Sequence, residues 1–277
     1  MNKLSTDKRV QVVGCLVEGM SIRATVRITG VAKNTVTKLL ADLGSASSEY
    51  QNEVMRDLKS VRVEFDEIWA YCYSKQKNVP EEHKDIYGYG DVWTWTALDA
   101  DTKLVPCWLV GERTYDDARV FIADLASRLA NRVQLTTDGY HPYLYAVEDA
   151  FGDDVDYAML RKLYGADPQA DKTKYSPAKC IGIDKQVKIG NPDRSKISRS
   201  YVERQNLTMR MGMRRFTRLT NGFSKKVENL AAAVALYFVH YNFGRVHQSL
   251  GKNTTPAMAA GIADHVWTCE EIAALLD

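Results

Sequence analysis

The hydrophobic pattern of the chain changes its period at about residue 60, and this change most limits the folds open to it. Before that point apolar residues recur three and four positions apart, as in Val10, Val13 and Val17, which is typical of an amphipathic helix. From Val61 to Phe65 apolar residues alternate with polar ones, which is typical of a strand. We therefore expect a helical N-terminal segment followed by a unit that contains a sheet.

Three helices are predicted within residues 5–43. Ser21 is the expected N-cap of the second helix, and Gly30 marks the tight turn after it. Two helices joined by such a turn predict a helix-turn-helix, whose last helix enters the major groove of DNA. The side chains expected to contact DNA from this motif are Arg23, Arg27, Lys33, Asn34, Thr35, Thr37 and Lys38. The alternative is a helical hairpin that contacts another protein.

The stretch GSASSEYQ, which begins at Gly44, is small and polar and predicts a linker. The predicted units are therefore a helix-turn-helix domain (1–44), a linker (45–59), a sheet-containing domain (60–245) and a C-terminal tail (246–277). Within the tail, Thr255 and Pro256 predict the cap and first-turn proline of a short helix.

The sheet-containing unit alternates between strand and helix patterns. Asp91–Glu112 predicts two strands around a turn at Asp99–Thr102. A helix over 114–130 with Val120, Phe121, Leu125 and Leu129 on one side, a strand over 133–137, a helix over 141–150 and a strand near 155–160 are expected next, with later helices over 200–216 and 224–242. Residues 164–199 predict no more than one strand pair within 179–189. This order favours an α/β protein with a mixed sheet flanked by helices.

Positive charge is concentrated in two blocks. The net charge is +2, but residues 1–44 carry +4 and residues 188–226 carry +9, which leaves −11 for the remainder. Two basic blocks on an otherwise acidic chain indicate a polyanionic partner contacted at two places. For either block alone, a solvated helix surface is an equally good explanation.

The five cysteines are scattered and include no C-x-x-C pair, so the sequence predicts neither a zinc ribbon nor a disulfide framework. We therefore expect the reducing cytosol as the compartment. No apolar run approaches the roughly 18 residues that a membrane span needs, so no membrane association is expected.

Two aspartates are expected at comparable positions in the sheet. Asp66 and Asp138 each end an apparent strand, and each points away from that strand's apolar set. If the two strands are neighbours, both carboxylates project from one edge of the sheet. The plain alternative is turn chemistry, because an Asp-Gly dipeptide such as Asp138-Gly139 favours a turn.

Glu203 is the third candidate carboxylate. It is the only acidic residue between Asp193 and Glu228, and it lies among arginines on a predicted helix. Its alternative role is a capping box with Ser200. Three oxygen-donor side chains suit Mg²⁺ or Mn²⁺, which accept phosphate oxygens in the same coordination sphere.

Five motifs in order carry a family resemblance: VEFDEIW, DVWTWTALDADTK, LTTDGYHPY, SYVERQNLTMR and HYNFGRVHQSLGKNTTPAMAAGI. With the N-terminal helices before them, the chain resembles the DDE-type transposases of bacterial insertion sequences, particularly the insertion sequence one family and its integrase-like relatives. The resemblance implies a ribonuclease H-like catalytic core and a metal-binding triad of Asp66, Asp138 and Glu203 that holds two Mg²⁺ or Mn²⁺ ions. Glu64 and Glu67 are rivals of Asp66, and Asp99 is explained by its hairpin turn.

A transposase would bind double-stranded DNA at the terminal inverted repeats of its element, cleave the ends and join them to target DNA. Pairing two ends implies a homodimer or larger assembly, and the location implied is the bacterial cytoplasm, at the nucleoid. In the second basic block, the residues expected to hold DNA phosphates are Arg204, Arg210, Arg214 and Arg215.

The alternatives are a ribonuclease H-like nuclease that cuts without joining and a non-catalytic helix-turn-helix regulator. One departure from the family is the gap of 64 residues between Asp138 and Glu203, which predicts an insertion over 164–199. His240 and His247 are predicted to be structural, with DNA contact or support of Glu203 as the alternative.

Overall fold

The computed structural model describes residues 4–165, 180–217 and 221–277. Its centre is a six-stranded mixed sheet in the order β3-β2-β1-β4-β5-β6. The strands are β1 (Arg62–Cys72), β2 (Gly90–Asp99), β3 (Trp108–Gly111), β4 (Gln134–Thr137), β5 (Asp156–Tyr164) and β6 (Cys180–Ile189). β1, β4 and β5 run parallel, whereas β2, β3 and β6 are antiparallel to their neighbours. The predicted mixed sheet is confirmed, and it is consistent with a ribonuclease H-like core.

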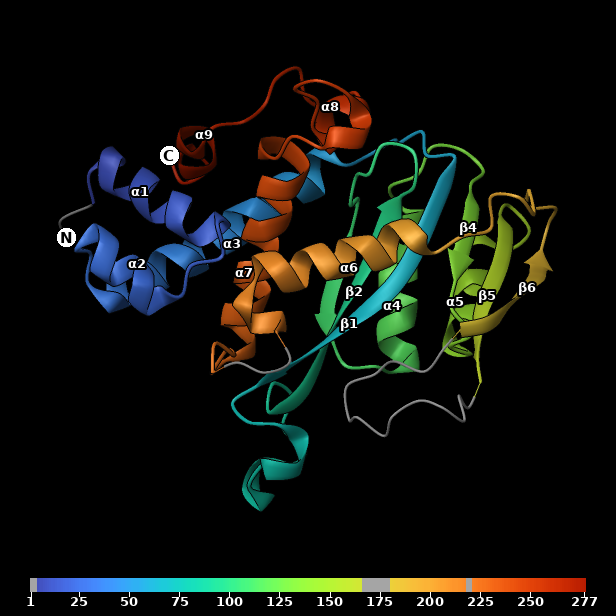
Figure 1. Cartoon of the computed structure of the whole chain (residues 1–277), viewed down its shortest axis with the longest axis horizontal. Coiled ribbons are helices and arrows are strands. Elements are labelled where there is room, and N and C mark those ends of the chain that lie inside the picture. The colour runs from blue at the N-terminus through green and yellow to red at the C-terminus, as the bar shows by residue number, and fades with distance from the viewer. Residues whose placement is uncertain (1–3, 166–179, 218–220) are drawn as a thin grey trace.

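Helices cover both faces of the sheet (Figure 1). On one face, α4 (Tyr115–Ala126) and α5 (Pro142–Phe151) bury residues such as Phe65, Trp95 and Leu135. On the other face lie α6 (Ser200–Gly212) and α7 (Val227–Val239). Because successive strand residues point to opposite faces, the even-numbered residues at the start of β1 face α6.

The N-terminal segment forms α1 (Thr6–Val17), α2 (Ile22–Thr29) and α3 (Lys33–Val54). As predicted, the Ser21 hydroxyl accepts a hydrogen bond from the Ala24 amide at 3.1 Å and caps α2. Gly30, at φ +70°, ends that helix in the left-handed conformation that favours glycine. The apolar side chains of α3 that recur at helical spacing are buried, namely Val36, Leu39, Leu40 and Leu43.

Residues 45–54, predicted as the start of a linker, instead continue α3 to Val54. The cause is tertiary packing, because α3 lies against α7 with Gly44 facing Ala232 at the point of closest approach. A Cβ atom on Gly44 would lie 2.4 Å from both Cα and Cβ of Ala232. The glycine that signals a break in the sequence therefore permits two helix backbones to approach each other.

The C-terminal residues are part of the same body. Short helices α8 (Pro256–Ala259) and α9 (Cys269–Ala274) follow α7, and the Thr255 hydroxyl caps α8 as predicted. α9 packs on α1, and Arg9 forms a 2.8 Å ion pair with Asp277. One apolar cluster includes residues of α1, α3, α7 and α9. The remaining short elements are 3₁₀ turns at Gln76–Asn78, Glu81–His83, Arg214–Phe216 and Gln248–Leu250 and a π-helical turn at His240–Gly244.

Three further expectations need correction. β1 extends to Cys72, so Asp66 lies inside the strand and not at its end. Val120, expected on the inner side of its helix, is 57% exposed. The strand pair expected within 179–189 is a single strand that pairs with β5, and the rest of the predicted insertion includes residues 166–179, which lie outside the described residues. Among the residues that are described, no helix is both long and apolar enough to cross a bilayer.

Candidate active site

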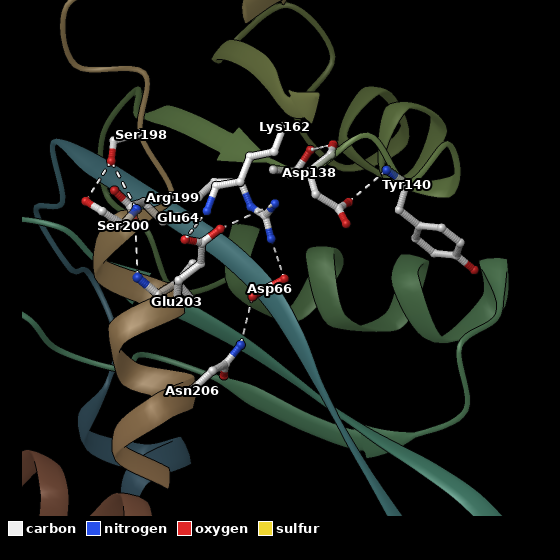
Figure 2. Close-up of polar contacts among 12 residues, drawn as sticks. Glu64, Asp66, Asp138, Tyr140, Lys162, Ser198, Arg199, Ser200, Glu203 and Asn206 are labelled. Atoms are coloured by element: carbon white, nitrogen blue, oxygen red, sulfur yellow. Dashed lines mark hydrogen bonds and ion pairs between the residues drawn. The ribbon is translucent and has the colours of Figure 1, made fainter. Parts of the chain in front are cut away.

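Asp66 and Asp138 meet where β4 leaves the sheet. β1 pairs with β4 only from Arg62 to Glu64, and the last pair joins Glu64 to Thr136. Asp138 directly follows β4 and therefore lies beside the part of β1 that continues past this pairing. The predicted turn chemistry is also present, because Asp138 Oδ1 accepts a hydrogen bond from the Tyr140 amide at 2.7 Å (Figure 2).

Asp66 is held from α6 (Figure 2). Its Oδ2 accepts a hydrogen bond from Asn206 Nδ2 at 2.9 Å, and its Oδ1 pairs with the guanidinium of Arg199. Burial raises the pKa of Asp66, the positive charge of Arg199 opposes that rise, and the nearby Asp138 and Glu203 add to it. The carboxylate is thus oriented by two partners from one helix and its N-terminal flank.

Glu203 lies on the same helix, but cationic side chains hold its carboxylate. Its Oε2 accepts a 2.5 Å hydrogen bond from Lys162 on β5, and its Oε1 lies 3.9 Å from Arg199. The capping box proposed with Ser200 is absent, because Arg199 is the N-cap of α6 and makes no side-chain cap. The Glu203 carboxylate is therefore already paired with two positive charges, those of Lys162 and Arg199.

Glu64, one rival of Asp66, has a structural role. Its Oε2 accepts hydrogen bonds from the amides of Tyr201 and Val202 at 2.9 and 3.0 Å. These amides belong to the first turn of α6, where a carboxylate is stabilised by unpaired N–H groups and by the helix dipole. Glu64 thus fixes the start of the helix that carries Glu203.

Glu67, the other rival of Asp66, joins the two aspartates in the structure. Asp66, Glu67 and Asp138 offer carboxylate oxygens that all lie within 4.8 Å of one another, and among the described residues this is the group of acidic, histidine or cysteine side chains arranged to hold a metal ion. Alternation along β1 points the side chains of Asp66 and Glu67 to opposite faces of the sheet. Asp138, which directly follows the neighbouring strand β4, nevertheless has a carboxylate oxygen within 4.8 Å of both.

Glu67 is buried beside the Tyr143 hydroxyl and one guanidinium, that of Arg113. Its side chain is 2% exposed, and Arg113 Nη2 lies 3.6 Å from its Oε2 and 3.6 Å from Asp138 Oδ2. Both separations exceed a normal hydrogen bond. Burial raises the pKa of Glu67 to about 7, the charge of Asp138 adds to the rise, and the Tyr143 hydroxyl and the charge of Arg113 oppose it. Arg113 itself packs over the rings of Tyr140 and Trp93.

Replacing Glu67 by glutamine should stabilise the metal-free protein at neutral and alkaline pH. The folded pKa of about 7 lies above the ordinary 4.5, so the folded protein retains a proton that the unfolded chain has lost. Its unfolding free energy should therefore fall as pH rises from about 4.5 to 7 and then level off. Glu67→Gln removes a cost on the order of 3 kcal/mol. Urea unfolding in chelator at pH 5 and pH 8 tests this, and an equal effect at both pH values would contradict it.

The donor set fits a hard divalent cation. Three carboxylates lie within mutual reach, and Glu67 Oε1 is a buried atom without a hydrogen bond of normal geometry. Oxygen donors of this kind suit Mg²⁺ and Mn²⁺. Of the predicted triad, the structure brings Asp66 and Asp138 into one group and keeps Glu203 on the adjoining helix.

The residues predicted to contact DNA lie in two places. Arg23, Arg27, Lys33, Asn34, Thr35 and Lys38 are exposed, and Thr37 is half-buried. In the second block Arg204 and Arg214 are exposed and Arg210 is half-buried. Arg215 differs, because its guanidinium donates to the Ser224 hydroxyl and burial lowers its pKa. We therefore leave Arg215 out of the candidate DNA surface.

The two histidines lie away from the carboxylates. Burial lowers the pKa of His240, which lines a cavity of ≈ 530 Å³ between α1, α6 and α7. His247 Nδ1 lies 3.0 Å from the Ser249 hydroxyl. Neither belongs to the metal-ligand group.

No protein-family model matches the chain, and no curated protein matches it. Seven chains of known structure do. One is described as a cryo-EM structure of the piggyBac transposase synaptic complex with hairpin DNA, with a TM-score of 0.45 and 9% sequence identity over 99% of this chain and 71% of that chain. Similarity at this level does not assign the chain to a family.

Proposed function

We propose that the chain is a DNA transposase that cleaves and joins DNA strands with the help of divalent metal ions. The observation that carries the proposal is the meeting of Asp66 and Asp138 on neighbouring parallel strands, beside a helix that presents Glu203. The five sequence motifs that resemble insertion-sequence transposases contain these same three residues.

Asp66, Asp138 and Glu203 would hold the ions. Bound Mg²⁺ or Mn²⁺ would activate the attacking oxygen and stabilise the leaving oxygen during in-line displacement at phosphorus. Arg199 and Asn206 orient Asp66, and Glu64 fixes the first turn of α6. For Glu203 to join a shared coordination sphere, its carboxylate would exchange Lys162 and Arg199 for the cation.

The α2–α3 unit would bind the ends of the element. Exposed Arg23 and Arg27 on α2 would contact phosphates, while the N-terminal residues of α3 enter the major groove. Arg204, one residue after Glu203 on α6, and Arg214, beyond the end of that helix, would hold backbone phosphates.

Removing one phosphate-binding arginine should reduce the salt dependence of DNA binding. For Arg27→Ala we expect weaker binding to duplex DNA and a slope of log K against log salt that is smaller by about 0.9. Fluorescence anisotropy across a salt series measures this. Arg119→Ala on α4 removes the same charge from an exposed position outside the proposed DNA surface and serves as the matched control. Equal slopes in the two variants would contradict the assignment of α2.

The test of the function is an in vitro strand-transfer assay with Mg²⁺ or Mn²⁺. Its substrates are duplexes from the inverted repeats that the proposal expects on both sides of the coding region. Joined products support a transposase. Metal-dependent cleavage without joining would instead identify a nuclease, and specific binding without cleavage would identify a regulator.

A further inference from the structure

Glu67 is a buried acidic side chain that the proposed mechanism does not use. It lies next to Asp66 in β1, its carboxylate is within 4.8 Å of those of Asp66 and Asp138, and its side chain is 2% exposed. Its Oε1 has no hydrogen bond of normal geometry, and the Tyr143 hydroxyl, which interacts with the Glu67 carboxylate, is likewise buried without one. A buried carboxylate whose oxygens are incompletely paired is costly to retain, and a cation bound by Glu67 would offset that cost.

The positive charge that the protein supplies to Glu67 and Asp138 is Arg113, whose ion pairs with them are longer than a hydrogen bond. Arg113 Nη2 is 3.6 Å from Glu67 Oε2 and from Asp138 Oδ2, and the Arg113 side chain is 35% exposed. Two carboxylates thus share one distant guanidinium, while Arg199 pairs with Asp66 on the α6 side. Buried charges need close compensation, and a divalent cation among the three carboxylates would supply it.

The Glu203 carboxylate has a close cationic partner, whereas the ion pair of Glu67 is longer. Its carboxylate receives Lys162 at 2.5 Å and lies 3.9 Å from Arg199. To bind a metal ion it would first have to release Lys162. Glu67 needs no such exchange on its Oε1.

We propose that Asp66, Glu67 and Asp138 form the first divalent-cation site of this protein, filled without DNA, and that Glu203 takes no part in it. The site takes Mg²⁺ or Mn²⁺, ions that accept carboxylate oxygens and keep part of their water shell. The inference rests on the proposed function for its biological setting only, because binding of the ion is measured without DNA and without turnover.

The experiment titrates MnCl₂ into the metal-free full-length protein, followed by calorimetry and by the electron paramagnetic resonance signal of free Mn²⁺. Removal of one ligand should weaken binding by about 100-fold or more in Glu67→Gln and in Asp138→Asn. Glu203→Gln should bind Mn²⁺ within about threefold of wild type, as should Glu112→Gln, which removes an exposed charge screened by water. Melting temperatures in chelator establish that each variant is folded, and Mn²⁺ should raise them in all but the first two.

Two results with the variants would overturn the inference. One is wild-type affinity for Mn²⁺ in Glu67→Gln, and the other is an equal loss of affinity in Glu203→Gln and Glu67→Gln. If Asp138→Asn fails to bind the ion and Glu67→Gln keeps it, the inference fails and the proposed metal centre survives. If strand transfer is never observed but Glu67→Gln fails to bind the ion, the proposed function fails and the inference survives. A wild-type protein that binds no Mn²⁺ overturns both.

Discussion

Asp138→Asn should lower the rate of strand transfer by roughly 10³-fold or more, equivalent to about 4 kcal/mol of transition-state stabilisation. Asparagine retains the oxygen that accepts the Tyr140 amide, so the turn after β4 should persist. It lacks the negative charge and one strong oxygen ligand. The effect should therefore appear in activity and in metal affinity, with the fold unchanged.

Asp99→Asn is the matched control. Asp99 also follows a strand pattern, and its Oδ1 accepts hydrogen bonds from the amides of Asp101 and Thr102, both at 2.8 Å. The substitution makes the same chemical change in the same kind of turn but outside the carboxylate group. Activity near that of wild type is expected. An Asp138→Asn enzyme as active as Asp99→Asn would remove Asp138 from the proposed mechanism.

Gly44→Ala should destabilise the protein by about 2 kcal/mol. Alanine in place of glycine inside a helix ordinarily gains about 1 kcal/mol. The new Cβ would lie 2.4 Å from Cα and Cβ of Ala232 and 2.9 Å from its carbonyl oxygen. Relieving that overlap requires α3 and α7 to separate, at a cost of about 3 kcal/mol, which outweighs the gain. Urea unfolding gives the difference through the transition midpoint.

Gly14→Ala provides the opposite sign. Gly14 is also inside a helix, α1, but a Cβ there would meet only Cys269 Sγ at 3.9 Å, an ordinary contact. We expect this variant to be as stable as wild type or more stable by up to about 1 kcal/mol. If Gly44→Ala instead stabilised the protein, α3 and α7 would lie further apart than the 2.4 Å between the added Cβ and Ala232 implies.

Local signals in the sequence were sufficient for most elements. Ser21 and Thr255 cap helices where predicted, and Asp138 follows its strand. Alternation starting near Val61 marks β1, and the hairpin around Asp99 has its predicted turn. These features depend on interactions among residues a few positions apart, so the sequence contains the information directly.

The errors arose where distant residues decide the outcome. The local sequence around Gly44 predicts the end of a helix, but in the structure this glycine lets α3 pack closely against Ala232 of α7. The alternation of apolar residues stops at Glu67, which predicts a strand end at Asp66. β1 nevertheless continues to Cys72, because β2 pairs with it from Val63 to Cys72.

The sequence alone was enough to recognise the mixed α/β order of elements and the two basic blocks. It was also enough to single out the candidate acids Asp66, Asp138 and Glu203. The sequence alone does not show which carboxylates lie close together. Their distances depend on where β4 ends beside β1 and on which cationic side chains contact α6. Folding brought Glu67 into the group and engaged Glu203 with Lys162. Periodicity fixes the face from which a side chain leaves its own strand, whereas contacts across the sheet depend on how far each neighbouring strand extends.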